Sequence, residues 1–309
     1  MGVESGLFPF EQILVGLTAS SADEELLNYA LVLRGVAREA RFRFVHVLGA
    51  YSDTDGRLMP ASADEAFDRI SSSVRRWFPE QRDGAAVTCQ VVEGPRIDRL
   101  LEFAVRERID LILVGHRPGR TGRRSMGRRL AMKAPCSLWL VPAGAPPEIS
   151  RVMAATDFSD HSAYAVSVAA KVSASAGLAR CWSLNVYFND LTIGLGERNE
   201  AIREIRKAEF QEFLHPLDLR GVCIEPIFEE SFSVAGAISV TARRVGADLV
   251  VMGTRGRSPS AAVLLGSESE QVMMESRVAV LIVKPPGERH SLLQVLLGGK
   301  LRTEAVAIG

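Results

Sequence analysis

The feature that most constrains the fold is an internal repeat with a spacing of 138 or 139 residues. The segment around Asp110 matches the segment around Asp248 at an offset of 138 (248 − 110), and two earlier segments match at 139 (152 − 13). The matching pairs are residues 13–16 with 152–155, 44–47 with 183–186, and 108–117 with 246–255. Three separated apolar segments in nearly constant register indicate a duplicated domain.

Each copy alternates short apolar runs with longer helical stretches. This pattern predicts an α/β fold of two tandem, doubly wound, five-stranded domains, each a parallel sheet covered by helices on both faces. Strands are expected at 12–17, 42–48, 87–92, 110–115, 137–141, 151–156, 180–187, 222–228, 248–252 and 278–283. Helices are expected at 22–40, 63–78, 95–108, 125–134, 160–177, 197–214, 233–245 and 267–276. The linker at 142–147 is rich in proline, which resists regular structure.

Composition narrows the class of partner and the compartment. Lys+Arg and Asp+Glu both number 37, so no overall field favours nucleic acid or an anionic membrane. No apolar run approaches the ~18 residues of a membrane span. The four cysteines, predicted to be buried and reduced, form no CxxC pair; they are Cys89, Cys136, Cys181 and Cys223. We therefore expect a cytoplasmic protein without nucleic-acid or membrane partners.

The second copy carries a glycine-rich segment after its fourth apolar strand. Gly253 and Gly256 are followed by nine residues and then by Gly266-Ser267, where a helix is expected to begin. Glycines let backbone N–H groups turn toward a ligand, and a helix N-terminus adds partial positive charge. The segment therefore predicts a phosphate-binding turn, although Gly253 and Gly256 could also serve a tight turn alone.

The spacing G-x2-G-x9-G-S resembles the nucleotide-binding signature of the universal stress protein family. Further support comes from residues 155–159 (ATDFS) and 134–141 (APCSLWLV), and the resemblance covers about residues 10–285. It implies an adenine nucleotide alpha hydrolase-like (HUP) fold with strand order 3-2-1-4-5 in each domain. It also implies that the last strands pair, Leu138–Val141 against Val280–Val283, so that one chain forms a pseudo-dimer and two chains can associate as a homo-oligomer.

On this basis we expect residues 1–145 to form a degenerate domain, 146–287 a domain with an intact nucleotide motif, and 288–309 a C-terminal tail. The resemblance implies that the second domain binds ATP, or ADP or AMP, with Mg²⁺. Asp157 would contact the nucleoside or the metal, and backbone near Val186 would edge the adenine. Arg255 would offset negative charge if its side chain points inward, the alternative being a solvated arginine on the loop. The phosphates would be cradled by Gly253, Gly256, Gly266, Ser267 and Ser269.

Several of these residues could instead have a purely structural role. Residues 157–160 could simply cap the following helix. Ser267 and Glu270 fit a capping box with Ser267 at the N-cap, a role compatible with phosphate binding. Glu268, in the first turn of that helix, is expected to repel a bound anion.

The first copy lacks the same features. Thr18 stands where the second copy has Asp157 (157 − 139), and Arg124 replaces the third glycine. Gly115 to Ser125 spans 10 positions (125 − 115), against 14 from Gly253 to Ser267 (267 − 253). The first copy is therefore predicted not to bind ATP. Its six loop arginines either bind another anion or face acidic residues of the second copy; they are Arg117, Arg120, Arg123, Arg124, Arg128 and Arg129.

Three functions remain open. The first is a nucleotide-dependent signalling module acting on an unknown protein partner, and the second is a nucleotide-free scaffold with both sites vestigial. The third is a slow ATPase, although no evident base or nucleophile is found and the histidines lack the spacing of a metal site. His46 is expected to be a core imidazole. The apolar stretch at 292–297 in the tail is expected to dock on its own chain or on a partner.

Overall fold

The computed structural model describes residues 7–49, 62–79, 87–118, 126–188, 197–254 and 265–285. The first half contains β1 (Gln12–Leu17), α1 (Asp23–Val36), β2 (Arg41–Leu48), α2 (Ala63–Trp77), β3 (Val87–Glu93), α3 (Arg96–Arg106), β4 (Leu111–His116), α4 (Met126–Lys133) and β5 (Ser137–Pro142). The second half contains β6 (Val152–Thr156), α5 (Asp160–Ser175), β7 (Arg180–Tyr187), α6 (Glu197–Leu214), β8 (Cys223–Glu230), α7 (Val234–Val245), β9 (Leu249–Gly253), α8 (Ser267–Glu275) and β10 (Ala279–Val283). Every expected strand and helix is present.

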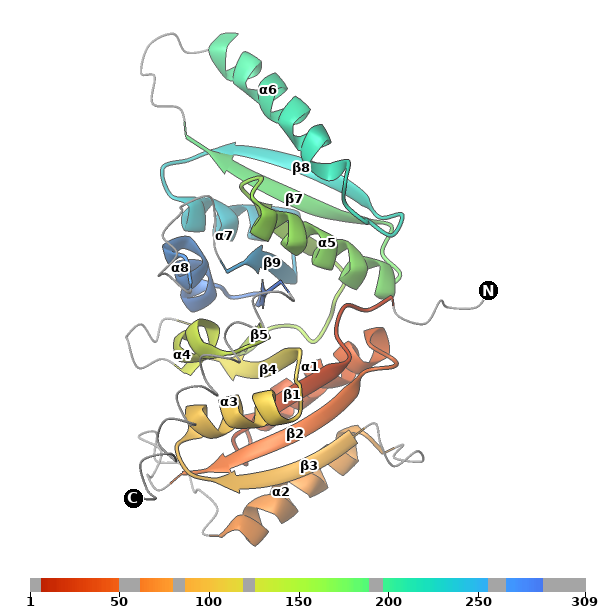
Figure 1. The fold of residues 1–309 in the computed structure, drawn as a ribbon, viewed down its shortest axis with the longest axis vertical. Helices are drawn as coiled ribbons and strands as arrows, with labels where there is room; N and C mark the ends of the chain where they lie inside the picture. Colours follow the sequence, from red (N-terminus) through yellow and green to blue (C-terminus); the bar gives the residue numbers. More distant parts are fainter. Residues whose placement is uncertain are drawn as a thin grey trace, which may run out of the picture.

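The strands form one ten-stranded sheet in the order β3-β2-β1-β4-β5-β10-β9-β6-β7-β8. Counted within its own half, each set of five strands has the order 3-2-1-4-5, which confirms the predicted fold class. All pairings inside a half are parallel, whereas β5 and β10 pair antiparallel, with Trp139 opposite Leu281. The two halves therefore lie end to end across this central pair, the first half below and the second above in Figure 1. The predicted pairing of the last strands is confirmed.

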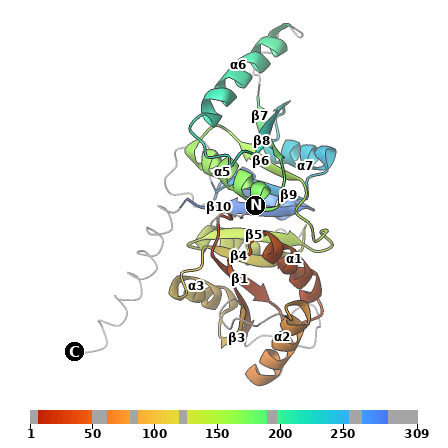
Figure 2. The same cartoon turned by 90° about the vertical axis from the view of Figure 1, so that its right-hand side faces the viewer.

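The core lies in two layers, one on each face of the sheet. Alternate residues of the central strands point to opposite layers: Trp139 and Leu281 join one cluster, and Leu138 and Ile282 join the other. The first cluster includes side chains of α1, α2, α5 and α6, and the second includes side chains of α3, α4, α7 and α8. Figure 2 shows helices on both sides of the sheet. Strands buried on both faces explain why the sequence has continuous apolar runs rather than alternating ones.

An aspartate that is repeated in the sequence fixes the start of each half-sheet. Asp110 accepts hydrogen bonds from the backbone N–H groups of Glu11 (2.9 Å) and Gln12 (3.1 Å), which ties the start of β4 to the start of β1. Its counterpart Asp248 accepts from the N–H groups of Ser150 (2.8 Å) and Arg151 (2.9 Å) at the start of β6. These carboxylates satisfy backbone donors at strand ends, so the repeated aspartate has a structural role.

Polar side chains of Lys284, His116 and Arg128 fasten the halves around the β5–β10 junction. The buried Lys284 Nζ donates to the carbonyl oxygens of Ala131 (2.8 Å) and Ala134 (2.6 Å) at the end of α4. The ring Nε2 of His116 lies 3.3 Å from the carbonyl oxygen of Met274 in α8. Arg128 of α4 forms a partly buried ion pair with Glu270 of α8. Of the two alternatives for the arginine cluster, contact with acidic residues of the other copy is confirmed for Arg128.

Two expectations need correction. Helix α1 ends at Val36 rather than near residue 40, because Ala40 N–H bonds to the Ala37 carbonyl (3.1 Å) in a turn that brings the chain into β2. The cysteines are not all buried, since Cys223 is exposed at the start of β8, an edge strand. Burial raises the pKa of Cys181 to about 12 and that of Cys89 to about 11, so neither is poised as a thiolate.

Candidate functional site

The predicted site residues of the second half gather at the carboxyl edge of its strands. Strand β6 pairs with β9 on one side and with β7 on the other, so Asp157, Val186 and Gly253 lie at the ends of three adjacent strands. Helices α5 and α8 leave this edge toward opposite faces of the sheet. Ligands of open parallel sheets bind at such a divergence of connections.

Gly253 lets the end of β9 approach the start of α5 closely. A Cβ at this position would lie 3.0 Å from the carbonyl oxygen of His161 and 3.1 Å from its Cβ. Contacts this short are tighter than most Cβ contacts in proteins, so a side chain here would force α5 to shift by a few tenths of an ångström. The packing therefore favours glycine at this position, independently of any ligand.

The two ends of the glycine loop are held together. The N–H of Gly266 donates to the carbonyl of Thr254 (2.7 Å), and the buried Ser269 hydroxyl donates to the carbonyl of Gly253 (3.0 Å). Ser269 thus positions the start of α8 against the end of β9. Arg255 and Gly256 lie outside the described residues.

Helix α8 begins one residue earlier than the predicted capping box requires. Gly266, with an extended ψ of 150°, is the N-cap, and Ser267 is the first helical residue. The predicted capping box of Ser267 and Glu270 is therefore wrong. Because glycine has no side chain, it provides no cap for the first-turn N–H groups of α8, and these groups remain suited to an anion.

The two acidic side chains in the first turn of α8 contact other parts of the protein. Glu268 Oε2 accepts a hydrogen bond from the N–H of Ala235 (3.0 Å), in the first turn of α7, and Glu270 pairs with Arg128. The carboxylate of Glu268 therefore stabilises the N-terminus of α7 instead of pointing at the N-terminus of its own helix. This contact reduces the repulsion that the sequence predicted for a bound phosphate.

Asp157 organises the turn between β6 and α5. Its Oδ1 accepts from the N–H (3.1 Å) and the hydroxyl (2.6 Å) of Ser159, and Ser159 in turn accepts from Ser162 N–H (3.3 Å) as the N-cap of α5. Phe158 between them has a φ of 63°, in the left-handed region. The capping role considered for residues 157–160 is confirmed, and it fixes the Asp157 carboxyl group at the strand edge.

A family model settles what kind of chain this is: the universal stress protein model matches residues 9–142 and again residues 148–284. The chain belongs to the universal stress protein family.

Individual relatives agree with this assignment. A universal stress protein of Thermus aquaticus is 35% identical over 136 residues, which are 97% of that protein but 43% of this chain. Its whole length therefore corresponds to about one of the two universal stress protein domains. Among solved structures, a protein of Pseudomonas aeruginosa PAO1 with unknown function aligns with a TM-score of 0.68 at 15% identity, covering 94% of this chain and 99% of that one. A universal stress protein of Archaeoglobus fulgidus gives 0.60 at 19% identity, covering 90% and 99%. These two similarities show the shared fold.

The first universal stress protein domain has the same backbone turn, but the carboxylate that bonds to the turn comes from a different position. Ala19 has a φ of 56°, matching Phe158 at the repeat offset (158 − 139), so the backbone turns in the same way. The carboxylate, however, comes from Asp23 in α1, which accepts from Thr18 N–H (2.8 Å), Thr18 Oγ1 (2.7 Å) and Ser20 N–H (3.2 Å). Burial raises the pKa of Asp23, and these hydrogen bonds oppose the shift.

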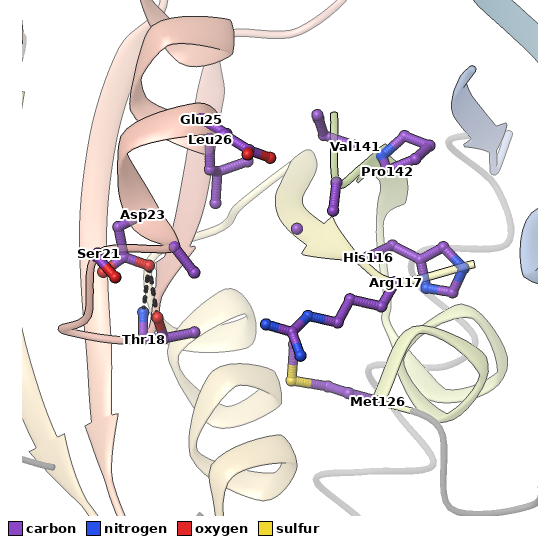
Figure 3. A pocket seen from close by; sticks show the side chains of 14 residues that line it. Thr18, Ser21, Asp23, Glu25, Leu26, His116, Arg117, Met126, Val141 and Pro142 are labelled. Carbon is purple, nitrogen blue, oxygen red and sulfur yellow. Dashed lines mark hydrogen bonds between the residues drawn. The ribbon is translucent and has the colours of Figure 1, made fainter. Parts of the chain in front are cut away.

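A cavity of about 370 Å³ lies at the carboxyl edge of this first domain, beside Asp23 and the end of β4. Figure 3 shows the side chain of Arg117 extending from the end of β4 toward the turn that holds Thr18 and Asp23. The sequence predicted the absence of an ATP site here but not the presence of a cavity. Of the six loop arginines, Arg120, Arg123 and Arg124 lie outside the described residues.

Two residues of the second domain were missed by the sequence reading. Asn185, on β7 beside Val186, donates from Nδ2 to the Thr156 carbonyl (2.9 Å), and its buried Oδ1 has no partner among the described residues. The buried Thr254 Oγ1 likewise has no described partner. The repeat offered a signal for Asn185, because it aligns this residue with His46 (185 − 139), which is also polar and lies in an apolar strand. In the structure, Nδ1 of His46 lies 3.1 Å from the Leu17 carbonyl oxygen. Burial lowers the pKa of His46, so the imidazole is neutral at pH 7.

No helix among the described residues combines the length and the apolar character that crossing a lipid bilayer requires.

Proposed function

We propose that the second domain binds ATP together with Mg²⁺ and that the protein acts as a nucleotide-dependent signalling module. The observation that carries the proposal is the start of α8. Its first turn has no side-chain cap, and the Gly266–Thr254 hydrogen bond holds it at the strand edge that also carries Asp157. A helix N-terminus with available N–H groups is a favourable place for phosphate.

The polar atoms around this edge also suit a nucleoside. Asn185 Oδ1 and Thr254 Oγ1 are buried, lack described partners, and belong to β7 and to the residue after β9. Buried polar atoms without partners are uncommon, and a ligand that donates hydrogen bonds would remove their cost. Val186, next to Asn185, is where the family resemblance puts the adenine edge.

Magnesium would be held mainly through the nucleotide. Among the residues that the structure describes, no group of three His, Cys, Asp or Glu side chains is gathered to bind a metal ion. Mg²⁺ commonly uses one or two carboxylates together with phosphate oxygens, and Asp157 is the carboxylate at this edge. When bound, the ion would neutralise phosphate charge.

Calorimetric titration of the full chain with ATP and Mg²⁺ tests the proposal. We expect saturable binding below about 1 mM. Ser267→Asp places a carboxylate in the first turn of α8, where it favours the helix but repels phosphate, so the folded variant should bind at least about tenfold more weakly. Ser72→Asp adds the same charge at an exposed position of α2 in the first domain and should bind as the original does.

The same titration separates the alternatives. A wild-type protein that binds no nucleotide at millimolar concentration would favour the nucleotide-free scaffold and remove the proposal. Equal affinities of Ser267→Asp and Ser72→Asp would place the nucleotide elsewhere. Turnover of ATP that disappears in Asp157→Ala would instead favour a slow ATPase.

A further inference from the structure

Four separate segments of the chain build the cavity of the first domain. One runs from the end of β1 into the first turns of α1, and the others are the end of β4, the end of β5 and the start of α4. Its volume of about 370 Å³ is at the low end of the range for ligand sites, which suits a small molecule. The ligand that it fits therefore follows from its own lining residues, and not from the nucleotide site of the second domain.

Both carboxylates that line the cavity already have hydrogen-bond donors. Asp23 accepts from the backbone and hydroxyl of Thr18 and from the backbone of Ser20. Glu25 Oε2 accepts from the N–H of Gly144, in the turn after β5 (2.9 Å). Since these groups are satisfied by the protein, they are weak candidates for contacting a ligand.

Arg117 is the cation of the cavity. In Figure 3 its side chain reaches from the end of β4 toward the turn that holds Thr18 and Asp23, and Met126 of α4 also lines the cavity. A guanidinium has five N–H donors in a planar fork, so it can hold a carboxylate in addition to its contacts with the protein. His116, the neighbouring residue, is neutral because burial lowers its pKa, and therefore adds no second cation.

The remaining walls are apolar. Leu26 of α1, Met126 of α4, and Val141 and Pro142 of β5 line the cavity. They line a space next to Arg117 that suits a short carbon chain, and Thr18 and Ser21 of the β1–α1 turn border the same space.

We propose that this cavity binds a small monocarboxylic acid, with the carboxylate on Arg117 and the carbon chain against Leu26, Met126 and Val141. A nucleoside triphosphate is disfavoured at this place. The first turn of α1 carries Asp23, Glu24 and Glu25, whose charges repel a polyanion at the helix N-terminus, whereas a single negative charge is balanced by Arg117.

Binding is tested with defined probes on the full chain. Lactate and 3-hydroxybutyrate are titrated by ligand-observed NMR, with lactamide and ethanolamine as neutral and cationic comparisons. The two acids should saturate near about 1 mM or below, and the comparison compounds should not. Excess ATP with Mg²⁺ should leave lactate bound, because the proposed nucleotide site is in the other domain.

Two variants locate the site. Arg117→Met should weaken lactate binding at least about tenfold. Arg129→Met removes an arginine of the same cluster that does not line the cavity and should bind lactate as the original does. If Arg117→Met proves unstable, Gly115→Leu serves instead, because Gly115 lines the cavity and a Cβ there meets no other atom within 4 Å.

The proposal is overturned by any of four results with folded protein. These are the absence of saturable lactate binding, equal binding of lactamide, tighter binding of ethanolamine, and competitive displacement of lactate by ATP. Unchanged lactate affinity in both Arg117→Met and Gly115→Leu would also overturn it. None of these outcomes depends on whether the second domain binds nucleotide.

Discussion

The two domains share one backbone turn and use it for different chemistry. Ala19 and Phe158 both take a left-handed conformation (φ of 56° and 63°), in the turn that follows the first strand of each domain. In the second domain the carboxylate of the turn is Asp157, at the strand end, and it bonds to Ser159. In the first domain the carboxylate is Asp23, which sits in α1 and bonds back to Thr18. The two domains therefore share the backbone geometry of this turn, but the carboxylate that bonds to it comes from a different position in each domain.

The same divergence appears where the domains meet. Lys284 of the second domain donates to the last carbonyls of α4, whereas His116 of the first domain contacts a carbonyl near the end of α8. The repeat offset pairs His116 with Thr254 (254 − 138), so these junction contacts are not copies of one another. The pseudo-dimer is therefore symmetric in its strands and asymmetric in the polar contacts that hold it.

The largest expected effect comes from breaking the asymmetric contact at Lys284. Lys284→Met keeps the volume of the side chain but leaves the Ala131 and Ala134 carbonyls without their donor, which should lower the free energy of unfolding by about 3 kcal/mol. Urea denaturation measures the change. Lys133→Met, an exposed lysine on α4, is the control with the same loss of charge, and equal stabilities of the two variants would contradict the capping role.

Gly253 and Gly115 occupy matching positions in the two domains, and their substitution sharpens the comparison. A Cβ at Gly253 lies 3.0 Å from the His161 carbonyl oxygen, whereas a Cβ at Gly115 meets nothing within 4 Å. Gly253→Ala should therefore destabilise the protein by about 2 kcal/mol, because α5 must move. Gly115→Ala should be neutral or slightly stabilising. A thermal unfolding series on both variants checks this, and similar melting temperatures would mean that α5 yields without cost.

Much of the fold could be predicted from the sequence, because the constraints are local and repeated. The apolar runs within residues 110–115 and 248–252 appear as β4 and β9, the equivalent fourth strands of the two half-sheets, which β5 and β10 separate. The expectation that the last strands would pair rested on the family resemblance, and the Trp139–Leu281 pairing confirms it.

The details of the site could not be predicted in the same way. Both Ser267 and Gly266 fit the start of α8, and the choice depends on how Gly266 bonds to Thr254 across a loop. The partner of Glu268 is the N–H of Ala235, 33 positions away on another helix, which no local pattern encodes. The cavity of the first domain could not be predicted, because its carboxylate is Asp23 in α1 rather than a residue at the end of the first strand.

The smallest effect concerns pH and tests whether His46 and Asn185 are interchangeable. Both bond to the last carbonyl of the first strand in their domain, at 3.1 Å and 2.9 Å. Burial lowers the pKa of His46, with Arg96 acting in the same direction and Asp23 in the opposite one. The unfolded chain therefore binds more protons below about pH 6.5, and the stability that neutral His46 provides is lost as the pH falls through that window. His46→Asn should keep the hydrogen bond and flatten the decline in melting temperature between about pH 7 and pH 5. We expect the pH dependence that remains to come from His116, whose pKa burial also lowers. If the melting temperature of His46→Asn parallels that of the original protein at every pH, the two positions are not equivalent.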